Sequence, residues 1–155
     1  MSGNEIYGPI PPGIGNLVSL TDLELYNNIF GACISASIGQ LQSLRFLSLS
    51  GNRISREIPT CIGNITGSIP SSLRALRGLR ELDLSRNYLS GRIPEYLADL
   101  QSLYYLNLSF NDFEGEVPTR GVFLNSSALS IIGNNKLCGG IASLRDWSKV
   151  GQGGS

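Results

Sequence analysis

The 155-residue sequence contains no histidine, and this absence excludes several kinds of active site. Histidine is the usual general base, a common metal ligand and the usual partner of a nucleophilic serine or cysteine. The sequence also lacks a Gly-rich nucleotide loop and the HRD and DFG motifs of protein kinases. We therefore predict that the chain is not an enzyme and that it holds neither a metal ion nor a small-molecule cofactor.

Charge is also scarce, because only 15% of the residues are charged and 12 basic residues balance 12 acidic ones. A neutral chain has no electrostatic footprint for nucleic acid or an anionic membrane, so neither is expected as a partner. No apolar run approaches the roughly 18 residues of a membrane-spanning helix, and the first residues do not form a signal peptide. The odd number of cysteines (Cys33, Cys61 and Cys138) leaves at least one thiol unpaired or paired outside the chain.

Leucine, asparagine and glycine, by contrast, recur with a fixed period. Four segments of 24 residues, 17–40, 41–64, 76–99 and 100–123, share the pattern L-x-x-L-x-x-L-x-L-x-x-N-x-φ, in which φ is apolar. Residues 4–16 match the back half of this repeat, and residues 65–75 match only its last eleven positions. We therefore assign repeats to 4–123, a capping segment to 124–141 and a Gly- and Ser-rich tail, expected to be disordered, to 142–155.

The repeat pattern predicts a stacked solenoid. Leucines at positions 7 and 9 alternate with polar residues, which is the period of a strand with one buried face. The asparagine that follows, at 28, 52, 87 and 111, can bond the backbone of neighbouring turns. One turn cannot bury its own apolar face, so stacked turns should form a parallel inner sheet of about four strands with an irregular or 3-10 convex side. We expect the strands over 45–50 and 80–85 to pair across the incomplete repeat, with 58–75 as the least regular stretch.

Two segments resemble a known family. LSGRIPEYLADL, residues 89–100, resembles the plant-specific class of leucine-rich repeat, whose fold is an α/β-type right-handed superhelix. NDFEGEVPTRGVFLNSSALSIIGNNKLCGGI, residues 111–141, resembles the juxtamembrane segment that closes the ectodomain of plant leucine-rich-repeat receptor-like kinases. The resemblance implies a plasma-membrane glycoprotein whose extracellular part binds a protein or peptide ligand and a co-receptor ectodomain, in signalling or defence.

The chain departs from this family in four places. It has no signal peptide or N-terminal pair of cap cysteines, and no second cap cysteine after Cys138. It also lacks the membrane helix and kinase, and 13 positions of one repeat are missing before residue 65. We therefore expect a truncated copy of the juxtamembrane end of a receptor ectodomain. The alternatives are a stand-alone secreted inhibitor or decoy, an engineered fragment and a non-functional truncated gene product.

Polar and aromatic residues between the strand leucines should face the concave side, because successive side chains alternate. We predict that a ligand contacts ten residues there: Asp22, Glu24, Tyr26, Phe46, Glu81, Asp83, Arg86, Tyr105, Asn107 and Phe110. Acidic side chains with flanking arginines suit a polar peptide, and aromatic residues are favoured interface anchors. Four strands roughly 4.8 Å apart make a narrow face, while a stable interface buries about 800 Å² per partner, so weak binding is expected from this face alone.

Three sequons, at Asn64, Asn107 and Asn125, are candidate glycosylation sites if the chain is secreted. A glycan on Asn107 would project from the inner sheet. The arginines at 74, 77 and 80 are expected to form a solvated face. Ile6, Ile10 and Ile14 are expected to be exposed at the N-terminal end, because a terminal repeat without a polar cap leaves its core open.

Overall fold

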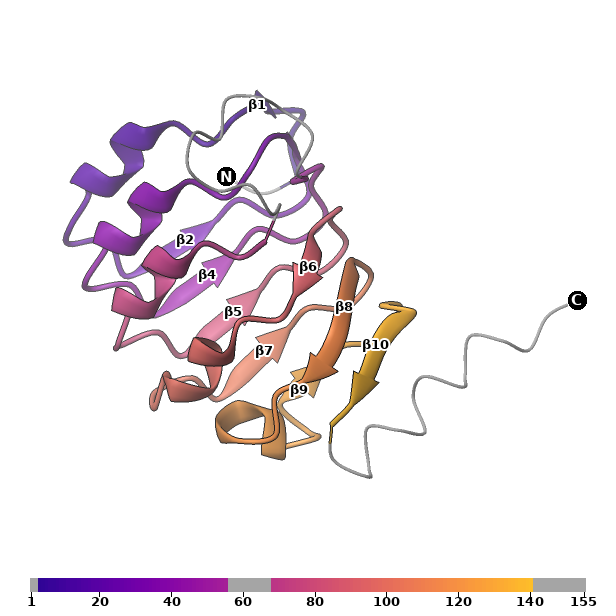
Figure 1. Cartoon of the computed structure of the whole chain (residues 1–155). Coiled ribbons are helices and arrows are strands. Elements are labelled where there is room, and N and C mark those ends of the chain that lie inside the picture. Colours follow the sequence, from indigo (N-terminus) through magenta and orange to yellow (C-terminus); the bar gives the residue numbers. More distant parts are fainter. Residues whose placement is uncertain (1–2, 56–67, 141–155) are drawn as a thin grey trace, which may run out of the picture.

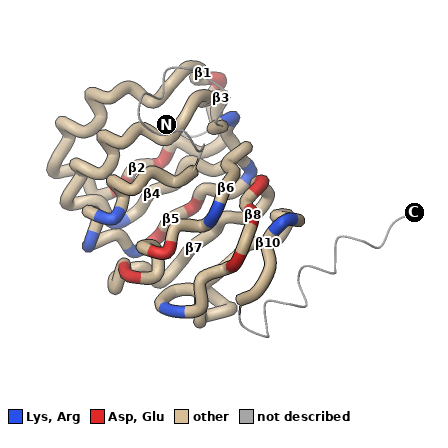
Figure 2. Tube along the Cα trace, in the orientation of Figure 1, with Lys and Arg blue, Asp and Glu red and all other residues tan. Residues whose placement is uncertain are grey.

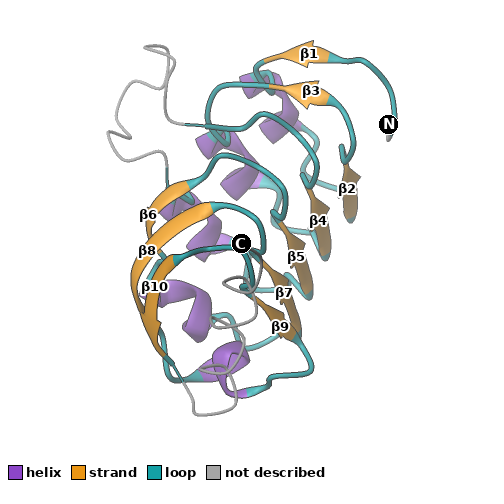
Figure 3. Cartoon of the chain, turned by 90° about the vertical axis from the view of Figure 1, so that its right-hand side faces the viewer, coloured by secondary structure: helices purple, strands orange, loops and turns teal. Residues whose placement is uncertain are grey.

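The computed structural model describes residues 3–55 and 68–140 as a solenoid of stacked coils (Figure 1). This arrangement confirms the predicted leucine-rich-repeat fold. A complete coil contributes a strand to an inner sheet, an extended segment to a second side and a short 3-10 helix to a third side, as Figure 3 shows. Within the described ranges, no helix is long and apolar enough to cross a bilayer.

Among the described residues, the inner, concave sheet is parallel and has five strands, one more than the repeats predict. In spatial order they are β2 (Asp22–Glu24), β4 (Phe46–Ser48), β5 (Glu81–Asp83), β7 (Tyr105–Asn107) and β9 (Leu129–Ser130). The additional strand, β9, lies in the predicted capping segment, where Leu129 pairs in register with Leu106. The capping segment therefore extends the sheet by one rung.

The leucines of these strands stack in one continuous core. The central leucine of each strand is at most 7% exposed and pairs in register with the next, in the series Leu23, Leu47, Leu82, Leu106 and Leu129. Burying such a side chain contributes about 1.5–3 kcal/mol relative to leaving it exposed. Because the neighbouring coil provides the burial, the stability of each coil depends on its neighbours.

A second set of parallel strands, not predicted from the sequence, lies across the coil from the inner sheet (Figure 3). One pair joins β1 (Tyr7–Gly8) to β3 (Ile29–Phe30), and the other group is ordered β6 (Ser90–Arg92), β8 (Asp112–Val117), β10 (Lys136–Gly139). The glycine of the G-x-I-P motif lies in these strands with φ of +81° at Gly91 and +83° at Gly115. Such φ values are strained for a residue with a Cβ atom, which explains the glycine.

Within residues 3–55 and 68–140, the convex side is formed by five 3-10 helices, as predicted: η1 (Pro12–Asn16), η2 (Ala36–Gln40), η3 (Ser71–Ala75), η4 (Glu95–Asp99) and η5 (Gly121–Leu124). A proline in extended conformation, with φ near −66°, precedes three of them, at Pro11, Pro70 and Pro94. Proline fixes this φ and has no N–H to leave unpaired at a helix start.

A ladder of asparagines stabilises the turn after each inner strand. The Asn52 amide donates to the carbonyl oxygens of Leu49 and Leu25 at 2.9 and 3.0 Å, and its oxygen accepts the Phe30 N–H at 3.0 Å. The same pattern of bonds occurs at Asn87 and Asn111, which confirms the predicted role. It also occurs at Asn134, so the capping segment supplies a further ladder residue.

The residue before each ladder asparagine has a left-handed backbone, with φ between +51° and +76°. These residues are Asn27, Gly51, Arg86, Phe110 and Gly133. Only glycine adopts this region freely, asparagine adopts it at reduced cost, and other side chains cost roughly 1 kcal/mol or more. The turn geometry therefore imposes this φ whichever residue occupies the position.

The inner sheet continues across the incomplete repeat, because β4 pairs directly with β5 and Leu47 lies opposite Leu82, as expected. The prediction that 58–75 is the least regular stretch is wrong over 71–75. There η3 packs between η2 and η4 and buries Leu73, so it supplies the convex segment of the coil that begins at β4. The rest of that stretch, up to residue 67, lies outside the described residues, and the repeat boundaries within 41–75 remain a prediction.

The two ends of the solenoid are covered differently. Ile10 is 3% exposed, so the prediction that it is exposed is wrong; its side chain packs in the core with the equivalent Ile34. Ile6 and Ile14 are half-buried. At the other end Phe123 is completely buried.

The described cysteines differ in state. Cys33 is disulfide-bonded, whereas Cys138 carries an exposed free thiol.

Candidate ligand-binding surface

The outward side of the inner sheet carries two rows of side chains in register. The first row is Asp22, Phe46, Glu81 and Tyr105, and the second is Glu24, Ser48, Asp83 and Asn107, which Ser130 extends. Seven of the ten residues predicted to contact a ligand belong to these rows. The structure therefore brings residues more than 80 positions apart in the sequence onto one surface.

The other three predicted residues, Tyr26, Arg86 and Phe110, lie just beyond the strands. None of the ten is buried: Asp22, Glu24, Arg86 and Phe110 are exposed, and the remaining six are half-buried. Half-burial follows from the parallel stacking, since each side chain is flanked by its neighbours on adjacent strands. All ten are accessible to a ligand, and their contact with one remains a prediction.

Hydrogen bonds within this surface hold several of its polar groups in place. The Tyr104 hydroxyl donates to Glu81 Oε1 at 2.6 Å, which joins two coils. This bond to Glu81 raises the pKa of Tyr104 above its ordinary value. Asp83 Oδ1 accepts the Ser85 N–H at 2.9 Å, and Asn107 Oδ1 accepts both the N–H and the hydroxyl of Ser109. Pre-oriented acceptors lose less conformational entropy when they bind a donor.

Arg86 and Phe110 form a cation–π pair at the end of the strands. The guanidinium carbon of Arg86 lies 4.7 Å from the centroid of the Phe110 ring. Phe110 is 45% exposed, so the pair presents both an aromatic edge and a cation to solvent. The repeat pattern contains no signal for this pairing, which depends on the contact between adjacent coils.

The charge on this surface is mixed, with acidic rungs bordered by arginine. Asp22 and Glu24 lie on β2, and Glu81 and Asp83 lie on β5. Figure 2 shows these acidic positions along the inner sheet and basic positions where the strands begin. Carboxylates two residues apart on one strand share a face. The arrangement therefore suits a ligand that combines basic and aromatic groups.

The glycosylation candidates differ in accessibility. Asn125 and Ser127 are both exposed in the turn after η5, where Asn125 Oδ1 accepts the Ser127 N–H at 3.1 Å. Asn107 is half-buried on β7 and Ser109 of its sequon is 4% exposed. Asn64 lies outside the described residues. Asn125 is thus the more accessible of the two described sequons.

Three residues of this surface are not among the ten predicted ones. Tyr104 bonds Glu81, Ser48 belongs to the second row, and Ser130 extends that row. Tyr104 occupies the repeat position just before the first row, which the pattern marks as surface but not as a bonding position. Among the described residues there is no group of three His, Cys, Asp or Glu side chains that could hold a metal ion.

Comparisons with known proteins place the chain among leucine-rich-repeat proteins. A family model described as leucine rich repeat matches residues 61–113, and a second with the same description matches residues 43–76. No curated protein sequence matches the chain.

Several solved structures are similar to the chain along most of its length. The ectodomain of the receptor kinase SOBIR1 from Arabidopsis thaliana is 30% identical, with 90% of this chain and 70% of that chain covered and a TM-score of 0.73. The Arabidopsis receptor kinase HAESA, solved with the peptide hormone IDA and the co-receptor SERK1, is 30% identical, with a TM-score of 0.71. That match covers 93% of this chain and 26% of HAESA, so the chain spans about a quarter of that structure. A pollen receptor kinase 3 is 33% identical, with 90% of this chain and 62% of that chain covered and a TM-score of 0.72.

Proposed function

The chain belongs to the leucine-rich-repeat family of plant receptor kinase ectodomains, and we propose that it is a recognition module that binds a peptide or protein ligand on its concave face. Among the structures that it resembles, HAESA was solved in complex with a peptide hormone and a co-receptor. The observation that carries the proposal is the pair of registered, solvent-accessible rows on the inner sheet, where carboxylates alternate with the aromatic rings of Phe46 and Tyr105. Such a surface fits a peptide that carries basic and aromatic side chains.

The proposed setting is the outer face of a plant plasma membrane, where ligand binding serves signalling or defence and a co-receptor ectodomain completes the complex. HAESA, solved with a peptide hormone and a co-receptor, supports partners of this kind. Because the chain spans 26% of HAESA, we expect its own face to bind weakly, with a dissociation constant no tighter than about micromolar.

Calorimetric titration with short synthetic peptides tests the proposal. One series combines arginine with an aromatic residue, and a matched series has glutamate in place of arginine. We expect only the arginine series to bind. A variant carrying Glu81→Gln and Asp83→Asn should weaken that binding roughly tenfold, because it removes two carboxylates and keeps the oxygen atoms that accept from Tyr104 and Ser85.

The matched control carries Glu114→Gln and Glu116→Gln, two exposed carboxylates with the same spacing on β8, across the coil. Its affinity should equal that of the unmodified chain. Equal binding of both peptide series, or an equal loss in the β8 variant, would refute recognition by the concave face.

A further inference from the structure

Two arginines lie side by side where the inner strands begin. The Arg45 N–H donates to the Thr21 carbonyl oxygen at 2.7 Å, and the Arg80 N–H donates to the Arg45 carbonyl oxygen at 2.8 Å. The two residues therefore occupy the same position on adjacent rungs, about 4.8 Å apart. Like charges directly opposite on neighbouring strands repel each other, so an anion bound between the two guanidinium groups would stabilise this placement.

Arg74 and Arg77 continue the basic surface around the coil from Arg80. All four arginines are exposed, and we call this set (Arg45, Arg74, Arg77 and Arg80) the arginine edge. Within the described part of the chain, Arg120 and Lys136 are the only basic side chains that form salt bridges. None of the described carboxylates forms a salt bridge with the arginine edge.

Two hollows lie along the arginine edge. The first, of about 380 Å³, is lined by Arg45 and Arg80 together with polar side chains that include Ser19, Thr21, Gln42 and Ser43. The second, of about 340 Å³, is lined by Arg74 and Arg77 with Tyr96, Leu100 and Gln101. Ser102 lines both, so the hollows adjoin. Each volume lies at the lower end of the range for small-ligand sites, roughly 300–1,000 Å³.

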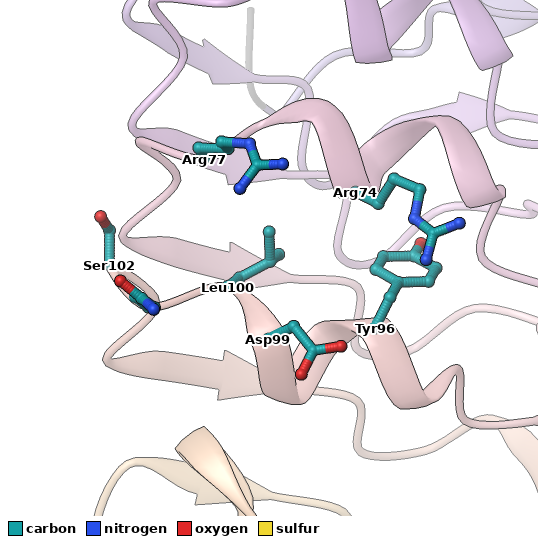
Figure 4. Close-up of a pocket in the computed structure, with 7 residues that line it drawn as sticks. Arg74, Arg77, Tyr96, Asp99, Leu100 and Ser102 are labelled. Atoms are coloured by element: carbon teal, nitrogen blue, oxygen red, sulfur yellow. The ribbon is translucent and has the colours of Figure 1, made fainter.

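The second hollow has a fixed floor, shown in Figure 4. The Tyr96 hydroxyl donates to the Pro70 carbonyl oxygen at 2.6 Å, and the guanidinium carbon of Arg74 lies 5.8 Å from the centroid of the Tyr96 ring. Arg77 reaches into the gap between the two coils (Figure 4). Asp99 also lines this hollow, but Arg120 forms an ion pair with it and neutralises its charge. The remaining charge in the hollow is therefore positive.

We propose that the arginine edge is a second binding site, separate from the concave face, for an oligosaccharide that carries carboxylate or sulfate groups. Arginine forks match the geometry of such oxyanions and bind them with two parallel hydrogen bonds. The hydroxyl and amide groups of Ser19, Thr21, Gln42 and Ser43 are partners for sugar hydroxyls, and the Tyr96 ring lies under the Arg74 guanidinium and helps to position it. Two adjoining hollows along the arginine edge fit a chain of repeated acidic units.

The chemistry of the hollows favours a sugar over other polyanions. Single-stranded nucleic acid binds through several stacked aromatic platforms, and the two hollows together offer one aromatic ring. Arginine clusters also recognise acidic peptide motifs. The hydroxyl and amide groups that line the first hollow favour a sugar, which presents many hydroxyls, and a titration with polyglutamate tests the peptide directly.

Isothermal titration of the full chain with a galacturonate oligosaccharide, a sulfated heparin oligosaccharide and neutral maltohexaose tests the proposal. We expect binding of at least one acidic sugar, no binding of the neutral one, and weakening with added salt. The acidic sugar that binds more tightly identifies the oxyanion. Changing both Arg45 and Arg80 to Gln should weaken binding at least about tenfold, and Arg77→Gln should weaken it by a smaller factor.

The matched control changes Arg53 and Arg92 to Gln, two exposed arginines outside both hollows. Its affinity should equal that of the unmodified chain, because these arginines lie outside both hollows. The change in net charge is the same as in the variant of Arg45 and Arg80, so only the position of the lost charges differs. Far-UV circular dichroism verifies that all variants fold. Failure of both acidic sugars to bind, an equal loss in the control, or tighter binding of polyglutamate or a single-stranded oligonucleotide would overturn the proposal. None of these outcomes bears on the concave face, whose test uses basic peptides.

Discussion

The two ends of the solenoid carry equivalent residues in different surroundings. The third residue of each 3-10 helix is apolar throughout, yet Ile14 of η1 is half-buried while Phe123 of η5 is completely buried. The first leucine of the repeat also depends on its neighbours, because Leu17, at the N-terminal end, is 52% exposed whereas Leu76, in the middle of the solenoid, is completely buried. The neighbouring coil, rather than the residue type, decides how much of each side chain is covered.

The C-terminal end is covered because the capping segment supplies the same structural elements as a repeat coil. It supplies the strand β9, the ladder residue Asn134 and the strand β10, which pairs with β8. At the N-terminal end, no described segment packs over the first coil in this way. We therefore expect equivalent substitutions to cost much more at the C-terminal end.

The largest difference is expected between Phe123→Ala and Ile14→Ala. Removing the Phe123 ring leaves a cavity in a closed core and should lower the free energy of unfolding by about 3–5 kcal/mol. The half-buried Ile14 should cost about 1 kcal/mol, because less surface is removed from water to begin with. Urea denaturation followed by circular dichroism measures both. Equal losses would mean that the two ends are equally closed in solution.

Substitution of the ladder asparagines extends this comparison to buried hydrogen bonds. Asn134→Ala leaves the buried Phe113 N–H and the Leu108 carbonyl oxygen without their partner and should cost about 2–3 kcal/mol. Asn28→Ala at the other end should cost less, because its oxygen accepts from the half-buried Ile6 N–H over a longer distance, 3.3 Å. Asn125→Ala, in an exposed turn, is the control and should change stability by less than about 1 kcal/mol. A larger loss for Asn28 than for Asn134 would contradict the comparison.

The interior of the coils could be predicted from the sequence because one period determines it. Leucine at positions 7 and 9 and asparagine at position 12 recur in each of the four 24-residue repeats. All of these leucines are buried, and so are the asparagines apart from the half-buried Asn111. The capping segment keeps this series at Leu129, Ile131 and Asn134, but 23 residues after their counterparts instead of 24. A search that allowed this shorter spacing would have found the fifth rung.

Interactions between coils could not be predicted in the same way. The contact of Arg86 with Phe110 and the bond from Tyr104 to Glu81 depend on which surface residues become neighbours after stacking. Sequence alternation assigns a residue to a face, and it does not specify rotamers or pairs on that face. The arginine edge has the same origin, because Arg45 and Arg80 are 35 positions apart and become adjacent only when β4 pairs with β5.

The residues with left-handed backbone before the ladder asparagines provide a further test of the two ends, with a smaller expected change in stability. Gly133→Ala places a Cβ atom 2.6 Å from Phe110 Cδ1 at a φ of +76°, so the ring must shift and the backbone is strained. We expect a loss of about 1–2 kcal/mol in the free energy of unfolding, measured by urea denaturation. Asn27→Gly, at the N-terminal end, relieves its φ of +51° and should change stability by less than about 0.5 kcal/mol. If Gly133→Ala left the free energy of unfolding unchanged, the turn would have to relax around the new methyl group.

The smallest effect on stability is expected for charges introduced at the N-terminal end. Leu17 and Val18 are 52% and 56% exposed, so changing both to Lys should alter the free energy of unfolding by less than about 0.5 kcal/mol. The same change should reduce self-association of the chain in sedimentation velocity, because adjacent exposed apolar side chains favour contact between molecules. Leu124→Lys is the control, since that leucine is 57% exposed at the covered end and is flanked by the exposed polar Asn125. If the control reduced self-association as much as the double variant, association would not be localised to the N-terminal coil, and the difference between the ends would be one of stability alone.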